Sequence, residues 1–208
     1  MVDHYKLQCA RWANRISGLS RDELRRKLPE LNAHGDHLAL WHFDRQVAID
    51  LNSGQLQCIS DADPLTLNEK LNIYTLLWYC KDGAVQSGQW LPFHSMKDAS
   101  PFAPAFEKSV LQSFTKAFDG KEELLKIAVT KLRGSQISSN RYFVPAFACM
   151  PLCLQFWDGD EDFPAQGTIL FDKNATDFIH VESLVTIASQ CVTALIRAVS
   201  LPINANQF

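Results

Sequence analysis

The sequence Phe156-Trp157-Asp158-Gly159-Asp160-Glu161-Asp162-Phe163-Pro164, followed by Thr168-Ile169-Leu170-Phe171-Asp172, decides the fold of the C-terminal part of the chain. Its centre holds four carboxylates in five positions. Such a run repels itself, so the fold must leave it in water or provide cations and backbone N–H groups for it. Apolar and aromatic residues lie on both sides, as is typical of strands. We therefore predict two strands, over about residues 152–157 and 167–171, joined by a charged loop.

Further strands are predicted on the N-terminal side of this hairpin. One lies over about residues 141–148. Alternation of apolar and polar residues from Leu38 to Leu51, continued at Leu56 and Cys58, predicts an antiparallel meander of three short strands. His42 shares a strand face with Leu38, and we predict that it is an inward, hydrogen-bonded histidine.

Apolar residues spaced by three and four predict the helices. They are expected over about residues 3–18 and 20–28, from Asp63-Pro64 onward, from Pro104 to Gly134 with a break at Asp119-Gly120, and over about 184–199. Residues 84–102 show no periodicity and are predicted to form a long ordered loop. Runs of strands that alternate with runs of helices predict an α+β fold. We expect antiparallel sheets of short strands, packed with about five helices, in one domain over residues 1–208.

Composition limits the functional class. The chain has 208 residues, 47% of them hydrophobic and 21% charged, which are globular values. A net charge of −3 without a basic face argues against nucleic-acid binding. No apolar run approaches the roughly 20 residues that span a bilayer, and the N-terminus lacks the apolar core of a signal peptide. We therefore expect a cytoplasmic protein that does not bind membranes, with six reduced cysteines, no Cys-x-x-Cys pair and no cofactor.

Several motifs carry a resemblance to a known family. They are the run from Trp157 to Pro164, Leu170-Phe171-Asp172, His180-Val181-Glu182-Ser183-Leu184, Ser87-Gly88-Gln89-Trp90 with Phe93, and Pro104-Ala105-Phe106. The chain resembles a family of bacterial and archaeal proteins that is catalogued only as a domain of unknown function. Ser183 departs from the pattern, because the family often has a second acidic residue there. The resemblance implies a family and no activity.

The acidic run has two interpretations. Asp158, Asp160 and Asp162 lie at positions 1, 3 and 5 of a calcium-type loop, but Phe163 replaces the glycine at position 6 and Ile169 replaces the carboxylate at position 12. An EF-hand is therefore excluded. The favoured interpretation is a solvated loop in which Phe163 folds back to plug the core. The alternative is a looser cation site, completed by Asp172 or Glu182.

A second cluster lies at the start of the last helix. His180 and Glu182 could serve acid–base chemistry or hold a metal, but we favour a structural role for them in capping the helix and complementing its dipole. Because about 16 Å of strand separates Gly167 from Asp172, we predict that the acidic loop and the His180 cluster are separate features without a shared metal. Trp90 either lines a pocket or anchors its loop to the core.

The sequence thus favours a non-catalytic accessory domain that binds a small molecule or a protein partner. The alternative is a metal-assisted hydrolase or lyase that uses the acidic-loop carboxylates and His180. No catalytic residue can be assigned, and a homodimer is compatible with the sequence. The candidate binding residues are Trp90, Trp157, Asp158, Asp160, Glu161, Asp162, Asp172, His180 and Glu182.

Overall fold

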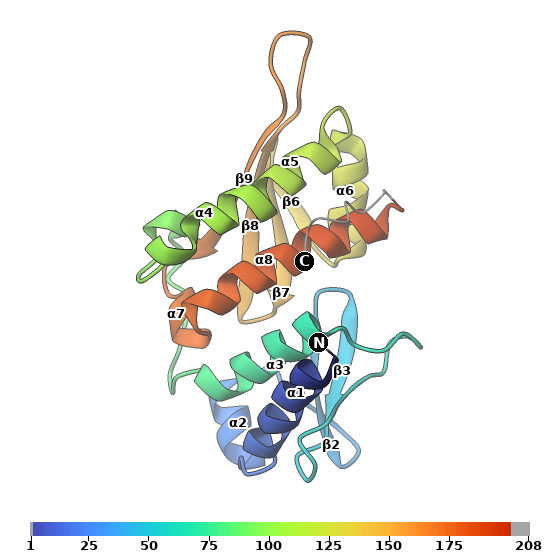
Figure 1. The fold of residues 1–208 in the computed structure, drawn as a ribbon, viewed down its shortest axis with the longest axis vertical. Coiled ribbons are helices and arrows are strands. Elements are labelled where there is room, and N and C mark those ends of the chain that lie inside the picture. The colour runs from blue at the N-terminus through green and yellow to red at the C-terminus, as the bar shows by residue number, and fades with distance from the viewer. Residues whose placement is uncertain (1, 201–208) are drawn as a thin grey trace.

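The fold combines two antiparallel sheets with helices, as the predicted α+β class requires. The structure is a computed structural model that describes residues 2–200, with the side chains of residues 6–200. A four-stranded sheet with the first three helices forms one half of the molecule, and a five-stranded sheet with the later helices forms the other (Figure 1). The two halves meet along α3 and α8, which pack against each other.

The N-terminal half is a meander packed against three helices. Its strands follow chain order, β1-β2-β3-β4. Its elements are α1 (Val2–Ile16), α2 (Arg21–Lys27), β1 (Asn32–His34), β2 (His37–His42), β3 (Arg45–Ile49), β4 (Leu56–Cys58) and α3 (Leu67–Tyr79). The three predicted strands are β2 to β4. β1 was missed because all three of its residues are exposed, so the strand has no inward face to give an alternating pattern.

The start of α3 differs from the prediction. The helix begins at Leu67 and not at Asp63-Pro64, because Thr66 and Glu69 form a complete capping box. The spacing of Leu67, Leu71, Tyr74 and Trp78 predicts one inward face of this helix, and the prediction is wrong at Trp78, which is 40% exposed. The buried residues of this helix include three polar ones, Glu69, Asn72 and Thr75. Glu69 binds Arg45 of the meander, and the amide nitrogen of Asn72 lies near His42.

The C-terminal half is a five-stranded sheet of order β5-β9-β8-β7-β6. Its strands are β5 (Trp90–Pro92), β6 (Ser135–Ser138), β7 (Arg141–Phe147), β8 (Met150–Trp157) and β9 (Gln166–Asp172). Its helices are α4 (Ala103–Phe106), the π-helical turn η3 (Glu107–Leu111), α5 (Gln112–Phe118), α6 (Glu122–Lys131), α7 (Ala175–Phe178) and α8 (Val181–Ala198). β7, β8 and β9 confirm the three predicted strands, and β8 pairs with β9 around the acidic loop as expected.

Two features of this half correct the sequence predictions. Residues 84–102 are not simply a loop, because β5 adds an edge strand to β9 and single 3-10 turns follow it. By length and apolar composition α8 could cross a membrane, whereas no such run was expected. A core helix passes the same test, and 56% of this window is buried inside the protein.

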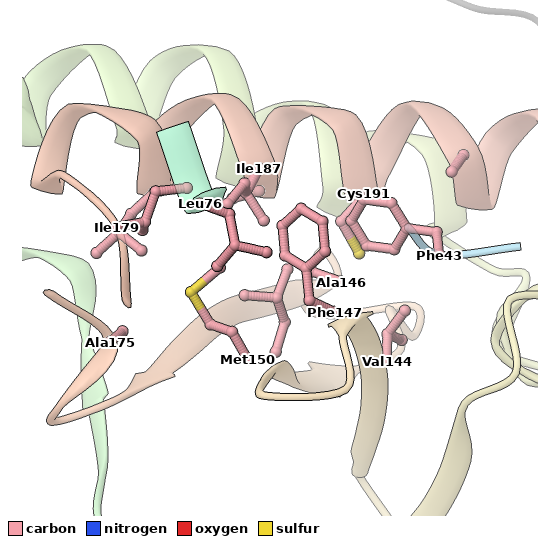
Figure 2. Close-up of a cluster of buried hydrophobic side chains, with 14 of the residues drawn as sticks. Phe43, Leu76, Val144, Ala146, Phe147, Met150, Ala175, Ile179, Ile187 and Cys191 are labelled. Carbon is pink, nitrogen blue, oxygen red and sulfur yellow. The ribbon is translucent and has the colours of Figure 1, made fainter. Parts of the chain in front are cut away.

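The two sheets are joined end to end by a buried junction. The backbone N–H of Phe43 and the Nδ1 of His42 both donate to the carbonyl of Ala146, at 3.1 and 2.9 Å. The His42 ring stacks on Phe147, with ring centroids 4.6 Å apart. Figure 2 shows the rings of Phe43 and Phe147 beneath α8, near Cys191 of that helix. His42 is thus the inward, hydrogen-bonded histidine that was predicted.

A buried ion-pair network fixes α3 to the meander. The guanidinium of Arg45 binds both carboxylate oxygens of Glu69, at 2.9 and 3.0 Å, and both oxygens of Asp61, at 2.8 and 3.1 Å. It also donates to the carbonyl of Asp63. Burial raises the pKa of Glu69, but hydrogen bonds from Thr66 and Arg45 outweigh it and leave this pKa below its ordinary value. The stabilisation is therefore present at neutral pH and is lost as the pH falls through the folded-state pKa.

We expect Arg45→Met to reduce the free energy of unfolding by about 3–5 kcal/mol, because it leaves the buried Glu69 without its cation. The matched control is Arg197→Met. Arg197 pairs with Asp44 at the surface, where an ion pair contributes about 0–1 kcal/mol. Urea denaturation of both variants measures the difference. Equal small losses would mean that the Arg45 network does not hold α3 in place.

Candidate functional site

The acidic loop is the tip of the β8–β9 hairpin, which projects at one end of the molecule (Figure 1). Asp158 turns back toward α6. Its carboxylate accepts hydrogen bonds from the backbone N–H groups of Gly120, at 2.6 Å, and Glu122, at 3.2 Å. The N-cap residue of α6, Lys121, gives no side-chain cap. Asp158 therefore caps α6 from a distant part of the chain.

The other residues of the loop face solvent. Asp160 accepts from the backbone N–H groups of Asp162 and Phe163, at 2.9 and 2.8 Å, and so closes a local turn. Glu161 and Asp162 are exposed. The prediction that Phe163 plugs the core is wrong, because its side chain is 66% exposed. The tight turn made by Asp160 leaves Phe163 beyond the end of the paired strands, where no core surface is available to cover it.

Asp172 is a buried structural carboxylate. It ends β9 and is 1% exposed. It accepts from the N–H and the hydroxyl of Ser87, and from the N–H groups of Gly88 and Asn174, at 2.8–3.0 Å. Burial raises its pKa, but these hydrogen bonds outweigh the burial and lower it. Asp172 thus holds the Ser87–Gly88 turn that leads into β5.

His180 and Glu182 lie at the start of α8. The Nδ1 of His180 accepts from the backbone N–H of Glu182 at 3.3 Å, which is the helix-capping role favoured by the sequence. Asp177 pairs with Lys81 at 2.6 Å. Glu182 is exposed and is one of the residues that line a cleft, which is described below. No hydrogen bond joins this cluster to Asp158 or Asp160.

The two candidate tryptophans lie on the second sheet. Trp90 is on the edge strand β5, and its ring lies 4.8 Å from that of Phe143 on β7. Strand register places Leu170 and Cys153 on the same face between them, and both are buried. Trp90 therefore covers the sheet face and anchors β5. Trp157, at the end of β8, is 47% exposed.

The structure thus keeps the predicted residues apart. Asp158 and Asp160 lie at the hairpin tip, Asp172 at the far end of β9, and Glu182 on α8. Within residues 2–200, no group of three or more His, Cys, Asp or Glu side chains is arranged to hold a metal ion. All six cysteines are free, and burial raises the pKa of Cys153 to about 11.

A cleft that no sequence pattern had indicated lies where α1, α3 and the first turns of α8 meet. Its volume is about 330 Å³. α3 packs against both α1 and α8 and lies between them in Figure 1, so it forms the floor. The lining residues are Gln8, Arg11, Trp12 and Arg15 from α1, Leu71, Asn72 and Thr75 from α3, and Glu182, Ser183 and Thr186 from α8. Of the predicted residues, this cleft contains Glu182.

The wall formed by α1 is positively charged. Arg11 and Arg15 are exposed, and neither forms an ion pair with a described residue. The guanidinium of Arg15 lies 4.8 Å from the ring centroid of Trp12 and 5.6 Å from that of Trp78, which orients it by cation–π attraction. Trp12 in turn stacks on the buried Tyr74 of α3. The cationic wall is thus fixed to the floor.

A buried side-chain acceptor without a partner lies on α3 beneath the cleft. Asn72 is 1% exposed, and its Oδ1 has no hydrogen-bond partner in the described part of the chain. Its Nδ2 lies 3.5 Å from the Nε2 of His42. Burial lowers the pKa of His42 to about 4, so the ring is neutral at pH 7. Because Nδ1 donates to Ala146, Nε2 is the acceptor for the Asn72 amide, and this fixes the amide orientation.

A weak sequence signal for this site existed. Arg11 and Arg15 are four residues apart on a predicted helix and so share one face. Nothing in the sequence could link that face to Asn72 or to Glu182, since the three residues come from segments far apart in the chain. Their meeting depends on how α3 packs between α1 and α8.

Comparison with known proteins shows a family match. The model of a protein family described as a domain of unknown function (DUF3786) matches residues 27–194. This range includes both sheets, Asn72 and Glu182, and it begins after Arg11 and Arg15. No curated protein and no solved structure matches the chain.

We expect Asp158→Ala to lower the free energy of unfolding by about 1 kcal/mol, because α6 loses the carboxylate that caps its first N–H groups. Glu161→Ala is the control. Glu161 lies in the same loop, is exposed and makes no hydrogen bond, so its loss should stay within about 0.5 kcal/mol. Chemical denaturation compares the two variants. A loss for Asp158→Ala no larger than for Glu161→Ala would contradict the capping role.

A second pair of variants tests the position of Phe163. Phe163→Ala should change stability by less than about 0.5 kcal/mol, since the ring is already in solvent. Phe156→Ala should cost about 3–5 kcal/mol, because Phe156 is 1% exposed and its ring packs 5.5 Å from that of Phe114. Thermal and urea unfolding give both values. Comparable losses would show that Phe163 is buried.

Proposed function

The chain belongs to the DUF3786 family, and we propose that it is a non-catalytic domain that binds a small polar molecule in the cleft between α1, α3 and α8. The family description gives no activity, so the proposal is based on the chemistry of this cleft. Its volume of about 330 Å³ lies within the range of small-molecule sites. It also lies where the two halves of the molecule meet, a place where ligand sites are common.

Charges of opposite sign on two sides of the cleft are the observation that carries the proposal. Arg11 and Arg15 on α1 and Glu182 on α8 line the cleft, and none of the three forms an ion pair with a described residue. Charged groups that are not neutralised by each other can bind a polar molecule of complementary charge. A bound molecule with an anionic group would be complementary to the wall formed by the two arginines.

The cleft residues favour binding over catalysis. Glu182 is the only Asp, Glu, His or Cys among the described residues that line the cleft, so these residues assemble no acid–base pair or activated nucleophile there. His42 is close to the floor, but its ring is buried, neutral and engaged at both nitrogens. The metal-assisted hydrolase or lyase has less support. It needs the acidic-loop carboxylates and His180 in one site, whereas these residues lie apart.

A protein-binding role is a second candidate, favoured by the hairpin tip. Trp157 and Phe163 are 47% and 66% exposed there. Large apolar side chains in solvent at a projecting tip are a common feature of interaction sites.

We also propose a cytoplasmic location, which is supported by the six free thiols.

Thermal unfolding with a panel of small molecules tests the cleft. The panel contains amino acids, dicarboxylates, sugar phosphates and neutral sugars, each in millimolar excess. A ligand at ten times its dissociation constant should stabilise the fold by about 1.4 kcal/mol, or raise Tm by roughly 3–5 °C. The shift should be lost in the double variant Arg11→Gln/Arg15→Gln.

The matched control for this experiment is Arg26→Gln. Arg26 is also an exposed arginine, but it pairs with Asp82 outside the cleft. The control should keep the full ligand-induced rise in Tm. The proposal fails if no compound in the panel raises Tm, or if the rise is the same in the double variant as in the wild type.

A further inference from the structure

We infer that the ligand of the α1–α3–α8 cleft is a small amino acid in its zwitterionic form, with its carboxylate toward Arg11 and Arg15 and its ammonium group toward Glu182. This inference rests on the proposed function and names the class of molecule that the cleft would bind. Two features of the cleft support it: a cationic wall on α1 and an anionic wall on α8.

The cationic wall fits a carboxylate. Arg11 and Arg15 lie one turn apart on α1, so their guanidinium groups can converge on one anion. Guanidinium groups bind carboxylates with two parallel hydrogen bonds, and this geometry favours Arg over Lys at such sites. Arg15 is already oriented by the two tryptophan rings, which lowers the entropy lost on binding.

The opposite wall fits a cation. Glu182 is the lining carboxylate, and it lies on α8 across the floor from α1. It forms no ion pair with any described residue, Arg11 and Arg15 included. The two walls therefore carry opposite charges that do not neutralise each other. A molecule with separated charges of both signs is complementary to this arrangement.

The anionic wall disfavours ligands that carry only negative charge. A phosphate or a dicarboxylate could bind the arginines, but it would be repelled by Glu182. An ammonium group provides three hydrogen-bond donors that the carboxylate of Glu182 can accept. The cleft therefore favours a molecule that carries both an anionic and a cationic group.

Matched probes separate these requirements. Isothermal titration calorimetry would measure the binding of the common L-amino acids to the wild-type protein. For each one that binds, two analogues would be titrated: the acid without its amino group, and the amide without its free carboxylate. We expect at least one amino acid to bind and both of its analogues to bind at least 10-fold more weakly.

Two variants assign the groups to the walls. Glu182→Gln keeps the size of the side chain and removes its charge, so it should weaken the binding of the amino acid at least 10-fold and should not weaken the binding of the deaminated acid. Arg11→Gln/Arg15→Gln should weaken the binding of the amino acid and of the deaminated acid alike. Glu182 and the arginines are exposed, and a circular dichroism melt without ligand would verify that each variant folds as the wild type does.

The possible failures are distinct. If dicarboxylates or phosphates bind through the arginines and amino acids do not, the inference of a zwitterionic ligand is wrong, while the proposed binding function stands. If an amino acid binds with the same affinity to Glu182→Gln as to the wild type, the assigned position of the ammonium group is overturned. If no compound binds in the cleft, both proposals fall.

Discussion

The carbonyl of Ala146 is the point on which the arrangement of the two halves depends. It accepts hydrogen bonds from the Nδ1 of His42 and from the N–H of Phe43, and so joins the end of the first sheet to the end of the second. Phe43 has a φ of 53°, a left-handed conformation that is unfavourable for a residue with a bulky side chain. The turn tolerates it because the Phe43 ring is buried and its N–H is bound. An unpaired carbonyl here would be costly, because Ala146 is fully buried.

The same junction fixes a residue of α3 beneath the cleft. Since His42 donates through Nδ1 to Ala146, its Nε2 must accept, and this holds the amide of Asn72 in one orientation. The unpaired, buried Oδ1 of Asn72 is therefore a consequence of how the two sheets meet. Arg45 provides the second constraint, because its ion pairs with Glu69 fix the first turn of α3 and hence the position of Asn72 one turn further along.

The acidic loop is the feature whose meaning changed most. Four carboxylates in five positions suggested either a cation site or a solvated loop, and the structure uses them individually. Asp158 caps α6, and Asp160 closes its own turn. A neighbouring acidic residue, Asp119, accepts from the N–H of Ala165 at 3.3 Å. Asp119 and Asp158 thus form reciprocal contacts between the α5–α6 turn and the hairpin. Backbone N–H groups take the place that a cation would have had.

Local sequence patterns determined the helices and strands that have one buried face and one exposed face. The strands β7, β8 and β9, the helices expected over residues 104–134 and 184–199 and the inward position of His42 follow from the spacing of residues along the chain. The exposed edge strands β1 and β6 and the exact start of α3 did not follow, because they depend on pairing and capping partners and not on periodicity. Only the tertiary structure decided that Phe163 lies in solvent, and that Arg11, Asn72 and Glu182 surround one cleft. Residues so far apart in sequence meet through the packing of α3 between α1 and α8, and no local pattern encodes that contact.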